Sequence, residues 1–164
     1  MPPQGKEVSH CFALNGDIFK PECVCIEGVI ETYMNAIHKV HFSGPTNFTP
    51  LLKFVNDMTE SMGVSQLRQK YNILLIITDG LIIDLGKTID EIVRGSDLPL
   101  SIIIVGVGNE DFSAMNQLDA DRIPLFSQKY YRKASRDIVQ FVPFSEYQDN
   151  PTELARKVLE ELPT

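Results

Sequence analysis

The sequence predicts an α/β fold in which helices cover both faces of a doubly wound, mainly parallel sheet. Two apolar runs carry this prediction: Ile73–Ile77, within the stretch Tyr71–Gly80, and Leu100–Val107. Unbroken β-branched runs of this length are typical of strands that are buried on both faces of a parallel sheet. The segment between them has the apolar spacing of a helix, so the two runs and this helix form a βαβ unit.

The bulk composition indicates a soluble globular protein. The chain has 164 residues, of which 43% are hydrophobic and 23% charged, so we expect one domain over residues 1–164, with residues 1–7 disordered. The formal charge of -7 argues against nucleic-acid binding, which needs a basic surface. The apolar runs are too short to span a membrane, no signal peptide is evident, and we expect an intracellular protein.

The remaining elements follow from local periodicity and from the positions of proline and asparagine. Pro50 is compatible only with the first turn of a helix, so that helix begins close to Asn47. Asn150 is expected to cap the last helix. The other predicted elements are a strand at Val8–Leu14, a helix from Pro21 to about Val40, a helix around Thr88–Gly95, a short helix at Asp111–Leu118, a strand at Arg136–Phe144 and a final helix at Pro151–Leu162.

Two polar residues are predicted to meet at the carboxyl edge of this sheet, where open α/β sheets bind ligands. Asp79 directly follows the first apolar run, and Thr46 lies in the loop before the helix that contains Pro50. A simpler role exists for each, because Thr46 can cap that helix and Asp79 can cap the turn after its strand. Asp84 can lie on the same rim, although a solvated surface carboxylate is the expected role for it.

Four motifs in order, GPTNFTP, NILLIITDG, LPLSIIIVGVG and DIVQFVPF, resemble the C-terminal von Willebrand factor A domain of the copines. The resemblance covers nearly the whole chain and implies the Rossmann-like fold of that domain. Copines are cytoplasmic proteins with two N-terminal C2 domains, which bind phospholipid membranes when calcium rises. The A domain recruits protein partners. The resemblance thus implies a non-enzymatic binding module within a protein that is peripherally recruited to membranes.

The resemblance also implies a metal-ion-dependent adhesion site. In that family of sites, Mg²⁺ or Mn²⁺ is held by a DxSxS loop, a threonine and an aspartate, which Thr46 and Asp79 match here. The ion keeps one position open for an acidic residue of an intracellular protein ligand. Oxygen ligands in near-octahedral geometry suit these ions. Ca²⁺ and phospholipid would bind only through C2 domains, which this stretch does not contain.

The DxSxS loop and its strand do not precede Val8, so we expect an N-terminally truncated domain with an incomplete metal site. The nearest string, Asp57–Ser61, lies inside a predicted helix and is interpreted as a chance match. Without that strand, the backbone of Tyr71–Thr78 would be unpaired along one side, which is costly when buried. Strand addition or exchange with a second copy would satisfy it, and would make a homo-oligomer.

Two other classes of function compete with this interpretation, an enzyme and a domain of a ubiquitin ligase. Gly106 and Gly108 follow a strand like a dinucleotide-binding turn, but Asp111 stands where a third glycine is needed. A magnesium-dependent hydrolase that uses Asp79 would need a second acidic ligand on a neighbouring loop, which we do not find. The copine-like domain of a RING-type ubiquitin ligase is the remaining alternative, although the paired Cys and His residues of a RING are not in this stretch.

Overall fold

A computed structural model describes residues 8–41, 43–65, 67–120, 123–160 and 162. They divide into one unit that ends at Pro45 and a second that begins at Thr46. The prediction for residues 1–7 lies outside the described residues, and a single domain over residues 1–164 stays a prediction. No helix in the described part of the chain is both long and apolar enough to cross a bilayer.

In its described residues, the first unit contains one helix, α1 (Cys25–Ile37). The predicted start at Pro21 is wrong, because α1 begins four residues later and Pro21 lies outside it. The predicted strand at Val8–Leu14 is also wrong, since these residues form turns and irregular backbone. Their alternating pattern is insufficient by itself, because a strand needs a hydrogen-bonded neighbour and none pairs with them among the described residues.

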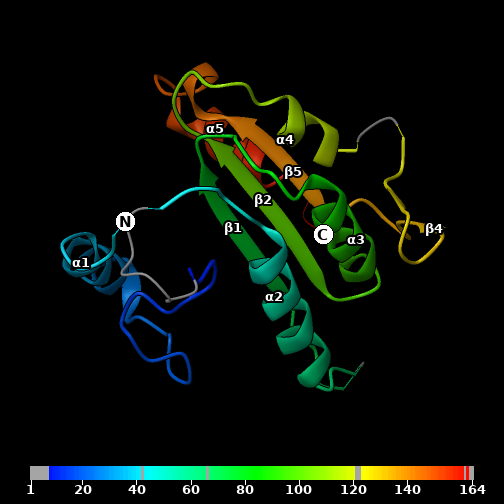
Figure 1. The fold of residues 1–164 in the computed structure, drawn as a ribbon, viewed down its shortest axis with the longest axis horizontal. Coiled ribbons are helices and arrows are strands. Elements are labelled where there is room, and N and C mark those ends of the chain that lie inside the picture. Colours follow the sequence, from blue (N-terminus) through cyan, green and yellow to red (C-terminus); the bar gives the residue numbers. More distant parts are fainter. Residues whose placement is uncertain (1–7, 42, 66, 121–122, 161, 163–164) are drawn as a thin grey trace. The chain divides into compact units, whose positions relative to one another are not determined.

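The second unit is built on a parallel sheet of three strands in the order β1 (Asn72–Thr78), β2 (Leu100–Gly106) and β5 (Val139–Pro143). The register runs from Asn72 opposite Leu100 to Thr78 opposite Gly106. Helix α3 (Leu85–Gly95) connects β1 to β2, as Figure 1 shows. The predicted βαβ unit is therefore confirmed, with its strands in parallel.

Helices flank both faces of the sheet, which confirms the predicted fold class. Helices α2 (Thr49–Ser61), α3 and α4 (Ser113–Leu118) contribute to the core on one face. Helix α5 (Pro151–Val158) packs along β5, where Val142 is buried outside that core. The core comprises Leu52, Val55, Ile76, Ile92, Val93, Leu100, Ile102, Ile104, Met115, Leu118, Val139, Phe141 and their neighbours.

The two long apolar strands differ in burial. Six of the seven residues of β2 are buried, but β1 leaves Ile73, Leu75 and Ile77 exposed at 54%, 57% and 66%. The prediction that both faces of β1 are buried is therefore wrong. The expectation that one side of this strand lacks a partner is confirmed, because within the described residues β1 is an edge strand that pairs with β2 alone.

The remaining elements agree with the sequence except in their limits. Pro50 lies in the first turn of α2, and the Asn150 side chain accepts a hydrogen bond from the Glu153 amide at 3.1 Å, both as predicted. β5 is shorter than the predicted strand, and a 3₁₀ turn (Phe144–Glu146) follows it. The two-residue strands β3 (Phe126–Ser127) and β4 (Arg132–Lys133) form an antiparallel hairpin that is too short to leave a periodic pattern.

A polar cluster joins α2 to α3. The Asn56 side chain is buried and donates to the backbone carbonyl of Glu91 at 2.9 Å and to its carboxylate at 3.2 Å. The Arg94 guanidinium bridges this carboxylate (3.2 Å) to Asp57 (2.5 Å) and Glu60 (2.8 Å) on α2. Asp57 therefore lies on a helix and pairs with Arg94. This packing role agrees with the interpretation that Asp57–Ser61 matches the DxSxS pattern by chance.

Candidate metal centre

Asp79 is the first residue after β1, at the carboxyl edge of the sheet. Its side chain is exposed, and no hydrogen bond or ion pair joins it to another described residue. The turn that follows is instead closed by Thr78, whose hydroxyl accepts a hydrogen bond from the Gly80 amide at 3.2 Å. The turn-capping role considered for Asp79 therefore belongs to Thr78, and the Asp79 carboxylate is available to a ligand.

Thr46 lies in the loop before α2 and is also exposed. The Ile83 amide donates to the Thr46 carbonyl at 3.2 Å, so this loop runs beside the segment that follows Asp79. Phe48 occupies the N-cap position of α2, and its side chain makes no capping hydrogen bond. Thr46 lies outside that position and does not cap the helix. The structure thus brings the two loops together through their backbones, although it shows no direct contact between the Thr46 and Asp79 side chains.

Asp84 fills the place that a capping side chain would take at the start of α2. Its carboxylate accepts hydrogen bonds from the amides of Phe48 (3.1 Å) and Thr49 (2.8 Å) and from the Thr88 hydroxyl (3.3 Å). The expected role as a solvated surface carboxylate is therefore wrong. Its partners Phe48 and Thr49 lie about 35 residues earlier in the chain, so local sequence patterns could not reveal them.

These hydrogen bonds change the acidity of Asp84. Burial alone would raise the pKa of its carboxyl, but the hydrogen bonds from Thr49 and Phe48 outweigh burial and lower the pKa below its usual value. A lowered pKa in the folded state stabilises the fold at every pH above the pKa of the unfolded chain. This contribution is lost as the pH falls through the lowered value, so acid loosens the attachment of the Thr46 loop.

The ring of Phe112 covers the turns at the ends of β1 and β2. A Cβ atom placed on Gly80 would lie 2.6 Å from this ring, and one placed on Gly106 would lie 2.7 Å from it and 2.9 Å from Phe141. The two rings contact each other, with centroids 5.4 Å apart. Gly106 thus serves aromatic packing and Gly108, with φ +93, serves the turn itself, so neither glycine requires a dinucleotide.

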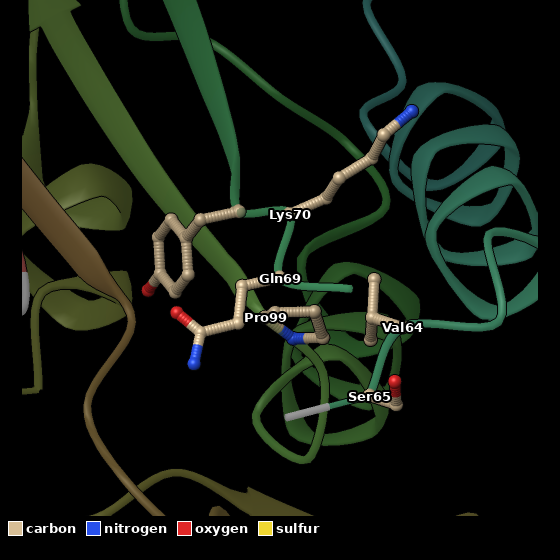
Figure 2. Close-up of a pocket in the computed structure, with 6 residues that line it drawn as sticks. Val64, Ser65, Gln69, Lys70 and Pro99 are labelled. Carbon is tan, nitrogen blue, oxygen red and sulfur yellow. The ribbon is translucent and has the colours of Figure 1, made fainter. Parts of the chain in front are cut away.

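Two hollows lie at opposite edges of the sheet. The first, of about 500 Å³, is lined by residues of the Thr46 loop and of the segment after β1, among them Asn47, Asp84 and Lys87. Figure 2 shows the second, of about 510 Å³, between Val64, Pro99 and their neighbours at the amino ends of β1 and β2. Only the first adjoins the candidate site.

The donors fit a hard divalent cation in kind, since a hydroxyl and a carboxylate are the oxygen ligands that Mg²⁺ and Mn²⁺ prefer. Among the described residues, no three His, Cys, Asp or Glu side chains cluster as in a metal site. Thr46 and Asp79 alone would supply two of about six positions in an octahedral shell. Water or a partner would have to supply the others, so the affinity of this stretch for a cation should be weak.

Comparison with known proteins identifies the family. The copine family model matches residues 1–164. Copine-A of Dictyostelium discoideum is 49% identical over 162 residues, which cover 99% of this chain and 26% of that protein. The chain thus spans about a quarter of the length of the relative it matches. With its parallel α/β sheet and a family match over the whole sequence, the chain belongs to the copine family.

Proposed function

We propose that this stretch is a non-enzymatic protein-binding module, which binds an intracellular partner through a divalent cation at Thr46 and Asp79. The observation that carries the proposal is the hydrogen bond between Ile83 and Thr46, which holds the two loops side by side while both side chains stay exposed. An exposed carboxylate without a protein partner is a suitable cation ligand.

The cation would give this edge of the sheet its preference for acidic ligands. The chain has a formal charge of -7, so an acidic segment of a partner would meet net repulsion at its surface. Mg²⁺ or Mn²⁺, when bound, supplies the positive charge that a partner carboxylate requires. The Thr46 hydroxyl and the Asp79 carboxylate would hold the cation, and water and a partner carboxylate would supply its other ligands.

In a longer copine, this module would act together with C2 domains outside the stretch. The proposal assigns calcium-dependent phospholipid binding, and recruitment from the cytoplasm to membranes, to those domains. Support comes from the family membership and from the length of the relative, of which this chain spans 26%. Sedimentation with anionic vesicles tests this division, since calcium should bring down a full-length copine but not this stretch alone.

Calorimetric titration with Mn²⁺ tests the cation site. We expect weak binding, with a Kd of about 1 mM, and at least about tenfold weaker binding by Asp79→Ala, because the variant lacks the only charged ligand. Asp137→Ala is the matched control, since it removes a carboxylate at the amino end of β5 that accepts a hydrogen bond from the Val139 amide. Equal affinity of the wild type and Asp79→Ala would contradict the proposal.

The open edge of β1 would accept a strand from a second copy. Ile73, Leu75 and Ile77 are exposed along one face, and no charged residue lies within Asn72–Thr78, so pairing buries no charge. Antiparallel pairing centred on Leu75 sets Ile73 opposite Ile77 of the second copy. Sedimentation velocity should show a dimer of the wild type and a monomer of Leu75→Lys. The control variant Leu81→Lys, at an exposed residue outside β1, should remain a dimer. A monomeric wild type at high concentration would refute strand exchange.

A further inference from the structure

One carboxylate connects the two loops of the candidate metal centre. Oδ1 of Asp84 accepts a hydrogen bond from the Phe48 amide at 3.1 Å, and Oδ2 accepts one from the Thr49 amide at 2.8 Å. Asp84 is at the same time the residue that precedes the first turn of α3. The start of α2 and the start of α3 are therefore joined through a single side chain.

We propose that Asp84 is a positioning residue for the cation site, which holds the Thr46 loop in register with the loop that carries Asp79. This inference rests on the proposed function of that site. Asp84 follows Ile83, whose amide donates to the Thr46 carbonyl at 3.2 Å. Two consecutive residues thus bind the loop from Thr46 to Thr49, one through its backbone and one through its side chain.

The loop needs such an attachment because the first amides of a helix have no partner within the helix. A side chain at the capping position usually accepts from one of them. In α2 that position is Phe48, which cannot accept, and Asp84 supplies both oxygens instead. Loss of the carboxylate would leave the amides of Phe48 and Thr49 to water and would release the loop that presents Thr46.

Asp84 is assigned to positioning rather than to cation binding because both of its oxygens already accept hydrogen bonds from the protein. Oδ1 accepts from the Phe48 amide and from the Thr88 hydroxyl, and Oδ2 accepts from the Thr49 amide. Asp79, in contrast, is exposed and has no partner among the described residues. The two carboxylates at this edge of the sheet thus have different proposed roles. Asp79 is the cation ligand, and Asp84 positions the loop that contains Thr46.

The experiment combines a measurement without metal and a measurement with Mn²⁺ on Asp84→Asn. An asparagine carries an NH₂ group in place of one carboxylate oxygen, and this donor cannot accept from a backbone amide, so the pair of bonds through two separate oxygens is lost. Without metal, amide hydrogen exchange should accelerate about tenfold or more at Phe48, at Thr49 or at both, while the amides of β2 stay protected and show that the core is folded. With Mn²⁺, calorimetry should show an affinity about tenfold lower than that of the wild type.

Asp137→Asn is the matched control, because Asp137 also accepts from a backbone amide, that of Val139 at 3.1 Å, but at the amino end of β5. It should leave both measurements unchanged.

Unchanged exchange at Phe48 and Thr49 in Asp84→Asn would overturn the attachment. Faster exchange with unchanged Mn²⁺ affinity would overturn the positioning role alone. Absence of Mn²⁺ binding by the wild type would refute the cation site, and with it the positioning role, whereas the exchange data would still report on the attachment.

Discussion

Gly80→Ala is expected to lower the free energy of unfolding by about 3 kcal/mol, as the sum of backbone strain and overpacking. Gly80 has φ +104, a conformation that a residue with a side chain rarely adopts. A Cβ atom at this position would also lie 2.6 Å and 2.8 Å from two atoms of the Phe112 ring. That ring has little freedom to retreat, because it packs against Phe141 on one side and over Gly106 on another.

Gly108→Ala separates these two causes. Gly108 has φ +93, close to that of Gly80, but a Cβ atom there would meet no atom within 4 Å. This variant should lose only the strain contribution, about 1 kcal/mol, in urea denaturation followed by circular dichroism. Equal losses in the two variants would show that the Phe112 ring does not constrain the turn beside Asp79.

Arg94→Met is expected to lower the free energy of unfolding by about 2 to 3 kcal/mol, because it removes one partner of a buried carboxylate. The side chain of Glu91 is only 6% exposed, and Arg94 joins it to Asp57 and Glu60 on the neighbouring helix. Methionine keeps most of the aliphatic volume, so the loss reports on the charged contacts. Lys129, at 3.6 Å from Glu91, compensates in part and keeps the loss below that of an isolated buried charge.

Arg156→Met is the matched control for Arg94→Met. Arg156 bonds Glu153 and Glu160 on the surface of α5, where solvent screens the charges. The same denaturation experiment should therefore show no measurable change for this variant. A similar loss in both variants would mean that burial of Glu91 adds nothing to the strength of the cluster between α2 and α3.

The sequence was sufficient for the parts of the fold that depend on local pattern. The β-branched runs predicted β1 and β2, proline predicted the start of α2, and asparagine predicted the cap of α5. The edge at which Thr46 and Asp79 lie also followed from sequence, because parallel strands place their carboxyl ends together. These features depend on residues that are close in the chain or on a general rule of sheet geometry.

The predictions that were wrong concern features that depend on contacts between residues distant in the sequence. The apolar side chains of β1 predicted burial on both faces, but burial requires neighbours, and Leu75 is 57% exposed. Asp84 was expected at the surface because nothing in its own segment shows that Phe48 and Thr49 donate to it. The alternation of Val8–Leu14 likewise gave no information about a partner strand, without which no strand forms.

The position of a bound cation distinguishes a site at Thr46 and Asp79 from a site on any other acidic surface of the protein. Mn²⁺ broadens the nuclear magnetic resonance signals of nearby amides, so a titration followed by ¹H–¹⁵N spectra locates the ion. If the cation binds at Thr46 and Asp79, the signals of residues 46–49 and 79–81 should weaken first, and those at the amino ends of β1 and β2 should persist. Broadening centred on the acidic residues of α2 or α5, with residues 46–49 and 79–81 unaffected, would refute a cation site at this edge of the sheet.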